Sequence, residues 1–214
     1  MFWDDIVLVT EIAEKYGARK PFADLGGMSR PCIADYELTI ESGVQNDRYI
    51  SLGQRPFDHI DPEYRIVNPA YGDPLIEEMP YSHRDAFGMA VCLNVLEHVQ
   101  NPFRVFAAIY QLMAADSLLV LSTVFEFPYH PSPIDYWRFS PDCLRYLAEH
   151  SGFRVLECDW RLHVNADRGV LDIERNEPQQ IKSVYVAAAK GDFIARPGTG
   201  YKLPSRFHLD GRPC

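Results

Sequence analysis

The sequence of 214 residues has little that marks a secreted, disulfide-bonded or membrane-spanning protein. Its five cysteines form no Cys-x-x-Cys pair and are odd in number, which favours reduced thiols in a reducing compartment. No run approaches the roughly 18 apolar residues that span a bilayer. Asp4 and Asp5 stand where a signal peptide carries basic residues. We therefore expect a soluble, cytoplasmic protein that does not bind a membrane.

Positive charge is also scarce, since 21 Lys and Arg face 30 Asp and Glu, a formal net charge of −9. An acidic surface repels phosphate backbones, so we expect no nucleic-acid partner. The sequence lacks the Gly-x-Ser-x-Gly of a serine hydrolase and the Gly-x-Gly-x-x-Gly of a nicotinamide dehydrogenase. Spaced pairs of metal ligands are also missing, and the adjacent Glu97 and His98 do not face one point on a helix. We expect no metal site.

The chain is long enough for one α/β domain, which we place at residues 1–190, followed by an irregular extension at 191–214. Apolar periodicity and capping residues predict helices at 3–17, 101–113 and 140–150, with a less clear one at 32–42. Apolar runs and alternation predict strands at 21–25, 48–52, 64–67, 86–93, 117–124, 154–159 and 183–189. This alternation of strands and helices indicates a parallel sheet covered on both faces.

The first segment that is suited to binding is Ala23-Asp24-Leu25-Gly26-Gly27, where a predicted strand ends in an acid and two glycines. Ligands of open parallel sheets bind just beyond the carboxyl ends of the strands, and glycine lets a ligand approach the backbone closely. A tight turn from strand to helix would produce the same pattern.

The second segment is Asn94-Val95-Leu96-Glu97-His98-Val99, directly after a buried strand. Polar groups at that position cost free energy unless they line a site. The alternative is that Glu97 pairs with or caps the helix of His98 and does no chemistry.

The third segment, Phe125 to Pro141, follows the next buried strand and combines many aromatic residues with His130, Asp135 and Arg138. An aromatic wall with a few polar groups is typical of a small-molecule pocket. Its prolines stiffen the segment and lower the entropy lost when a ligand orders it. A plain aromatic cover on the edge of the sheet is the alternative.

These segments, in this order, resemble the class I S-adenosylmethionine-dependent methyltransferases. The resemblance covers roughly residues 20–190 and depends on Leu96-Glu97-His98-Val99 with Pro102, and on His130-Pro131 with Asp135-Tyr136-Trp137-Arg138-Phe139. It implies a Rossmann-like fold, a mostly parallel seven-stranded sheet with helices on both faces. Residues 183–189 would form its one antiparallel strand.

The resemblance also implies S-adenosylmethionine as cofactor, with S-adenosylhomocysteine as product. The residues it assigns to the cofactor are Asp24, Gly26 and Gly27 under the methionine part, Asp73 at the adenine amino group, and Asn94 beside the cofactor. Gln54 would take the ribose in place of the usual acid, although Asp58 or Asp61 is also within reach.

Three further positions depart from the family pattern. Met28 and Arg30 stand where the glycine-rich loop has its second and third glycines, and a side chain there narrows the space for the cofactor. Gly88 stands where an acid often begins the fourth strand, although Asp85 lies close by.

The resulting hypothesis is an enzyme that transfers a methyl group by in-line displacement to an oxygen or nitrogen of a small organic molecule or sugar. His130 is the first candidate base, with Asp135 orienting it, and His98 is the second. Arg138 would hold an acidic group of the substrate, and the apolar wall would be Phe125, Tyr129, Tyr136 and Trp137. Two alternatives are a repurposed protein that binds a ligand without methyl transfer and a partner subunit of an active enzyme. A homo-oligomer is left open.

Overall fold

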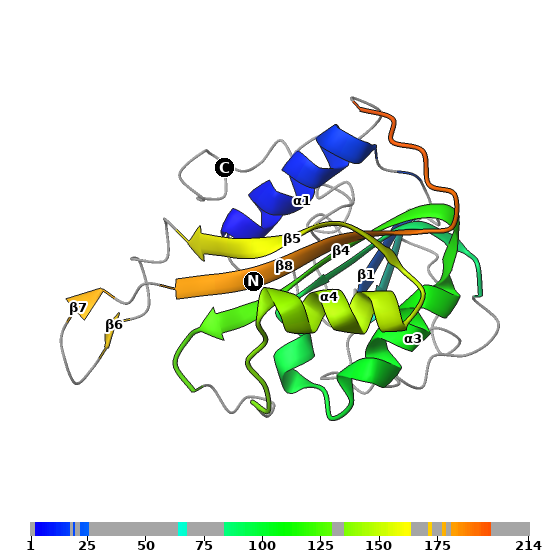
Figure 1. The fold of residues 1–214 in the computed structure, drawn as a ribbon. Helices are drawn as coiled ribbons and strands as arrows, with labels where there is room; N and C mark the ends of the chain where they lie inside the picture. The colour runs from blue at the N-terminus through cyan, green and yellow to red at the C-terminus, as the bar shows by residue number, and fades with distance from the viewer. Residues whose placement is uncertain are drawn as a thin grey trace, which may run out of the picture.

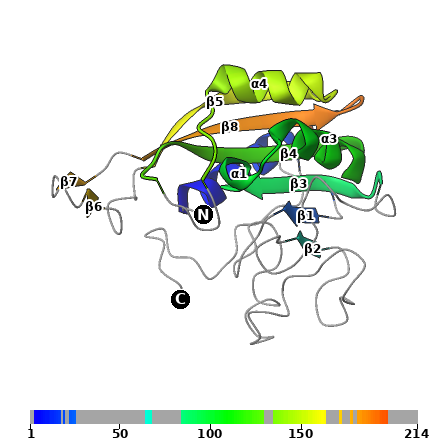
Figure 2. The same ribbon diagram turned by 90° about the horizontal axis from the view of Figure 1, so that it is seen from below.

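The structure is a computed structural model that describes residues 3–17, 19, 22–25, 64–67, 84–129, 135–163, 171–172, 177–178 and 181–197. Within these residues the centre is a six-stranded sheet of order β2-β1-β3-β4-β8-β5, which Figure 2 shows from one edge to the other. Its strands are β1 (Phe22–Leu25), β2 (Tyr64–Val67), β3 (Phe87–Leu93), β4 (Met113–Glu126), β5 (Arg154–His163) and β8 (Ile181–Lys190). A separate two-stranded sheet pairs β6 (Leu171–Asp172) with β7 (Glu177–Pro178).

The sheet is parallel from β2 to β4, and β8 is antiparallel to both of its neighbours, β4 and β5. This confirms the prediction that residues 183–189 form the antiparallel strand. The strands predicted at 86–93, 117–124 and 154–159 are also present, and the last two extend further along the chain, to Glu126 and His163. The predicted strand 48–52 and helix 32–42 lie outside the described residues.

Helices cover both faces of the sheet, as predicted. Figure 1 shows α1 (Trp3–Tyr16) on one face and α3 (Pro102–Leu112) with α4 (Pro141–His150) on the other. The helix boundaries follow the local sequence: the side chain of Asn101 caps α3 and that of Ser140 caps α4, each followed by proline in the first turn. Gly17, at a φ of 88°, ends α1 in a conformation that favours glycine.

Each face of the sheet has its own apolar core. Strand residues alternate between the two, so that Leu118 and Val120 of β4 pack under α1, while Leu119 and Leu121 pack under α3 and α4. Val9 and Ile12 of α1 complete the first core, which confirms the predicted apolar face of that helix. None of the described helices is long and apolar enough to cross a membrane.

The residues that follow β8 pack against α1. Phe193 is buried in the core under α1, and the Arg196 N–H donates to the Tyr16 carbonyl oxygen at 2.8 Å. At the same end of the sheet, the structure explains why position 88 is glycine and not the acid of the family pattern. A Cβ at position 88 would lie 2.5 Å from the carbonyl oxygen of Arg19. The nearby Asp85 is engaged by Lys190 at 2.6 Å, at the end of β3 opposite the predicted site.

Candidate functional site

The carboxyl ends of β3 and β4 lie side by side and carry the second predicted segment. The chain leaves β3 through Asn94, whose φ of 54° is a left-handed conformation that asparagine tolerates better than most residues. The Asn94 N–H donates to the Ser122 carbonyl oxygen at 2.9 Å, which fixes the turn against β4. A short 3-10 helix, η4 (Leu96–His98), follows at once. The turn therefore has a defined position on the sheet.

Two consecutive hydroxyls of β4 meet two fully buried carboxylates at this edge. Ser122, on the α1 face, donates to Asp5 Oδ1 at 2.9 Å, and Thr123, on the opposite face, donates to Glu97 Oε2 at 2.8 Å. The side chains of Asp5 and Glu97 are both 0% exposed. Because neighbouring residues of a strand point to opposite faces, one edge holds a carboxylate above and another below the sheet.

Asp5 was missed as a site residue by the sequence analysis. It accepts a second hydrogen bond from the Asn94 side-chain amide, Nδ2 to Oδ2, at 2.7 Å. The partners are 89 and 117 positions away in the sequence, which no local pattern reveals. One signal existed: Asp5 occupies the apolar stripe of α1, one turn before Val9.

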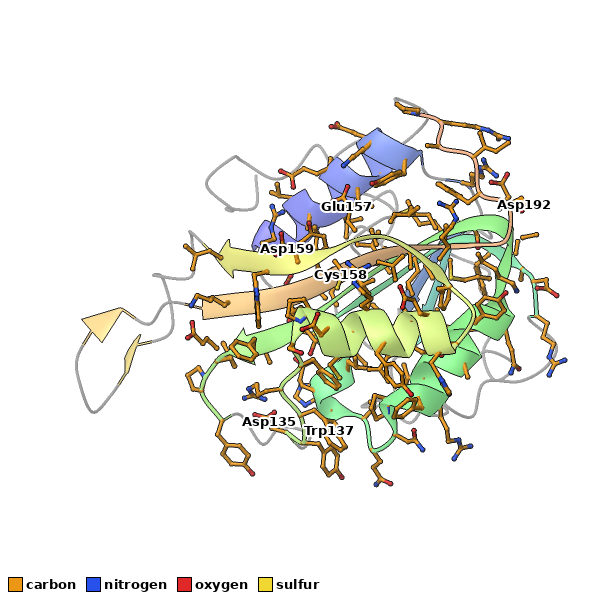
Figure 3. The ribbon with its side chains drawn as sticks, viewed as in Figure 1. Asp135, Trp137, Glu157, Cys158, Asp159 and Asp192 are labelled. Atoms are coloured by element: carbon orange, nitrogen blue, oxygen red, sulfur yellow. The ribbon has the colours of Figure 1, made fainter. Side chains whose placement is uncertain are left out.

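The second and third predicted segments are fastened together by two hydrogen bonds. The Tyr136 N–H donates to the Glu97 carbonyl oxygen at 2.8 Å, and the Trp137 indole N–H donates to the Val99 carbonyl oxygen at 2.8 Å. Figure 3 shows Asp135 and Trp137 next to each other in the segment that leads into α4. The structure therefore unites two groups of residues that lie about 40 positions apart, 38 in the case of Trp137.

Arg138 and Asp135 form a clamp within the third segment. The guanidinium donates to both carboxylate oxygens of Asp135 and to the carbonyl oxygens of Phe127, Pro128 and Trp137. The hydrogen bonds to Asp135, helped by the charges of Asp135 and Glu97, raise the pKa of Arg138 although burial opposes them. The guanidinium thus joins both ends of residues 127–138. Roles for Arg138 in binding substrate and for Asp135 in orienting His130 stay predictions, since His130 lies outside the described residues.

The four predicted wall residues are all accessible on the described surface. Phe125 is 37% exposed, Tyr129 73%, and Tyr136 and Trp137 42% each. Phe125 packs edge to face against Trp160 of β5, with ring centroids 4.5 Å apart. Trp160 was missed by the sequence analysis because it belongs to a strand that returns from a distant part of the chain. The aromatic surface is therefore wider than one segment.

Of the other predicted site residues, only some belong to the described part of the chain. Asp24 lies on β1 in register with Val91 of β3, so both strands end at the same edge. Gly26, Gly27, Gln54 and Asp73 lie outside the described residues. His98 places Nε2 3.8 Å from Glu97 Oε1. Within the described ranges, no three His, Cys, Asp or Glu side chains gather as metal ligands, and the absence of a metal site stays a prediction.

One neighbour of β1 bears on the ribose contact. β2, at Tyr64–Val67, pairs in parallel with β1 along its whole length. Gln54, the predicted ribose contact, comes shortly after the predicted strand 48–52, and both lie outside the described residues. Among the described residues, the strand that pairs with β1 on the side away from β3 is this later one, β2.

Comparisons with known proteins agree with this fold. A family model described as a methyltransferase domain matches residues 30–157, more than half of the chain. No curated protein sequence matches. Among solved structures, a candidate methyltransferase from Bacillus halodurans is 11% identical at a TM-score of 0.55, covering 88% of this chain and 99% of its own.

Two further structures widen the range of activities found on the fold. The [4+2]-cyclase SpnF is 16% identical at a TM-score of 0.52, covering 89% of this chain and 84% of its own. A phosphoethanolamine N-methyltransferase 2 from Haemonchus contortus, solved with phosphomonomethylethanolamine and S-adenosylhomocysteine, is 10% identical at a TM-score of 0.54. That alignment covers 88% of this chain and 53% of the other. These likenesses support the Rossmann-like fold, and the family match shows that the chain belongs to the methyltransferase domain family.

Proposed function

We propose that the protein transfers a methyl group from S-adenosylmethionine to an oxygen or nitrogen of a small organic molecule or sugar. One observation carries the proposal: the aromatic segment at 135–139 is hydrogen-bonded to the segment that follows β3. Ligands of open α/β sheets bind at this carboxyl edge. Membership in the methyltransferase family supports the reaction class, and the exposed aromatics suit a compact organic substrate.

Four of the proposed cofactor residues lie at or just after the carboxyl ends of β1 and β3, two neighbouring parallel strands. They are Asp24, Gly26, Gly27 and Asn94, with Asp73 at the adenine and Gln54 at the ribose. The cofactor, when bound, supplies an electrophilic methyl group on a sulfonium. The contribution of the protein is to hold the nucleophile close to that methyl and in line with the leaving sulfur.

For the proton, His130 is the proposed base, because an imidazole titrates near neutral pH. The clamp between Arg138 and Asp135 supports this role indirectly, since it holds the carbonyls of Phe127 and Pro128 just before His130. His98 is the second candidate base. A methyl-transfer rate that survives His130→Ala and falls in His98→Ala would move the assignment to His98.

Titration calorimetry with S-adenosylhomocysteine tests the cofactor site. We expect micromolar binding, about −8 kcal/mol, that is lost in Asp24→Ala and in Asp73→Ala. Asp192→Ala is the matched control, because Asp192 is exposed at the opposite end of the sheet (Figure 3). Binding that is absent from the wild type, or equally strong in all variants, would contradict the proposal.

A second candidate function is ligand binding or catalysis without methyl transfer. The similarity to the cyclase SpnF favours it, as do Met28 and Arg30 in the expected glycine-rich loop. The two candidates differ in one measurement: transfer of a labelled methyl group to a panel of small hydroxyl and amine compounds. Cofactor binding without any transfer across the panel would favour the second candidate.

A further inference from the structure

The orientation of the Asn94 side-chain amide is set by its hydrogen bond to Asp5. The Asn94 NH2 group donates to Asp5 Oδ2 at 2.7 Å, and the other Asp5 oxygen accepts from Ser122. The amide oxygen, Oδ1, therefore points away from Asp5. This oxygen is buried, and none of the described residues donates a hydrogen bond to it. A buried acceptor costs free energy until a donor reaches it.

Asp5 is itself held from a second direction. Ser122 Oγ donates to its other oxygen at 2.9 Å, and the side chain is fully buried at the base of α1. The apolar contacts of Val9 and Ile12 hold α1 on the sheet. The Asp5 carboxylate therefore has no access to water. Its hydrogen bond, and not a rotamer preference of Asn94, holds the Asn94 amide in place.

We propose that Asp5 is a positioning residue that holds Asn94 Oδ1 as the acceptor for the α-ammonium group of the bound cofactor. The inference rests on the proposed function. Asn94 follows β3, and β3 lies beside β1, whose carboxyl end is the proposed contact of the methionine part. The ammonium group is the cationic N–H donor of that part, and a carbonyl oxygen suits it better than an NH2 group. Asp5 acts only through Asn94 and does not touch the ligand.

The substitution Asp5→Asn tests the orientation directly. The new amide can donate to Asn94 while it accepts from Ser122, or accept from Asn94 while it donates to the Ser122 hydroxyl, so it no longer holds Asn94 in one orientation. In the first arrangement Asn94 turns its NH2 group toward the ammonium. We expect S-adenosylhomocysteine to bind more weakly, by at most about tenfold, the full loss of roughly one hydrogen bond to a charged group.

Methylthioadenosine provides the decisive comparison, because it lacks the amino-acid part of the cofactor. Its affinity should change less than about twofold in Asp5→Asn. Calorimetry on both ligands, with thermal unfolding of each variant, gives the readout. Equal losses for the two ligands would mean that Asp5 merely stabilises the site, and would overturn the proposal.

A reciprocal exchange supplies the rescue. In Asp5→Asn combined with Asn94→Asp, the carboxylate at position 94 accepts from the amide at position 5 and keeps one oxygen for the ammonium. An acid tolerates the left-handed backbone there nearly as well as asparagine does. We expect S-adenosylhomocysteine affinity to return to within about threefold of the wild type. Failure of a folded double variant to recover would overturn the proposal.

Two further outcomes are distinguishable. If the Asp5 variants do not fold, Asn94→Gly removes the proposed acceptor itself, leaves Asp5 with Ser122 and suits the left-handed backbone, and the selective loss for S-adenosylhomocysteine should still appear. Equal affinity of that variant and the wild type for both ligands would overturn the positioning role. A wild type that binds neither ligand would overturn the proposed cofactor site itself, whereas binding that is indifferent to residues 5 and 94 would overturn only this inference.

Discussion

Both faces of the sheet have the same interaction at the carboxyl edge, but it has a different role on each face. On each face a fully buried carboxylate accepts a hydrogen bond from a β4 hydroxyl, Asp5 from Ser122 and Glu97 from Thr123. Glu97 belongs to the turn after β3, and its own carbonyl holds the aromatic segment through Tyr136. Asp5 comes from α1 and holds the side chain of Asn94. One carboxylate anchors backbone that carries the site, and the other orients a group within it.

Removing Glu97 should have the largest effect on stability. Glu97→Ala leaves the Thr123 hydroxyl without its buried acceptor and creates a cavity beneath the aromatic segment. We expect the free energy of unfolding to fall by about 2–4 kcal/mol, measured by urea denaturation. Glu149→Ala is the matched control, because Glu149 is exposed and its ion pair with Arg145 is long at 3.9 Å. Similar small changes in the free energy of unfolding of both variants would show that the buried Glu97 carboxylate does not stabilise this face.

The hydrogen bond of Trp137 tests the same face with a smaller change. Trp137→Phe keeps an aromatic ring but removes the indole donor to the Val99 carbonyl oxygen. We expect a loss of about 1 kcal/mol in unfolding free energy, and weaker binding of aromatic-stacking substrates. Tyr136→Phe is the control, since the contact of Tyr136 with Glu97 uses its backbone N–H. If Tyr136→Phe loses as much unfolding free energy as Trp137→Phe, the indole hydrogen bond does not hold the aromatic segment at 135–139 in place.

On the opposite face, Glu157 tests what fastens α1, and with it Asp5, to the sheet. Its carboxylate accepts from Lys15, from Tyr16 at 2.7 Å and from Tyr185 at 3.3 Å. Burial by itself raises the pKa of Glu157, but the hydrogen bonds from Lys15 and Tyr16 outweigh it, so the pKa is lowered. Figure 3 shows Glu157 beside α1.

A lowered pKa fixes the sign of the pH dependence. The contribution of Glu157 is complete above the ordinary glutamate pKa of about 4.3 and is lost as the pH falls through the lower, folded value. We therefore expect wild-type stability to decrease below about pH 5 more steeply than that of Glu157→Gln, by a few tenths to about 1 kcal/mol. Urea denaturation at pH 7 and at pH 3.5 measures this. Parallel curves for the two proteins would contradict it.

The sequence predicted the second half of the fold better than the site. The elements from β3 to α4 have local signals, such as Asn101-Pro102 and Ser140-Pro141, that act within one turn of the helix they begin. Contacts between distant segments leave no such signal. Asp5 and Trp160 become site residues only because α1 and β5 return to the carboxyl edge. The partner of Arg138 was present three residues away, but spacing within a loop does not show which side chains meet.

Cys158 provides the smallest test, on the face of Glu97 and away from the proposed ligands. Its thiol donates to the Pro141 carbonyl oxygen at 3.2 Å, and burial raises its pKa to about 11. At pH 8 only about a thousandth of it is thiolate, so alkylation should be far slower than in the urea-unfolded chain. Because the thiol contacts the first turn of α4, its labelling rate reports local opening there. Mass spectrometry should show that rate unchanged in Asp5→Asn and raised in Glu97→Ala. An equal rise in both would mean that the two carboxylates act on one cooperative unit, and that the two faces are not separable in the way their contacts indicate.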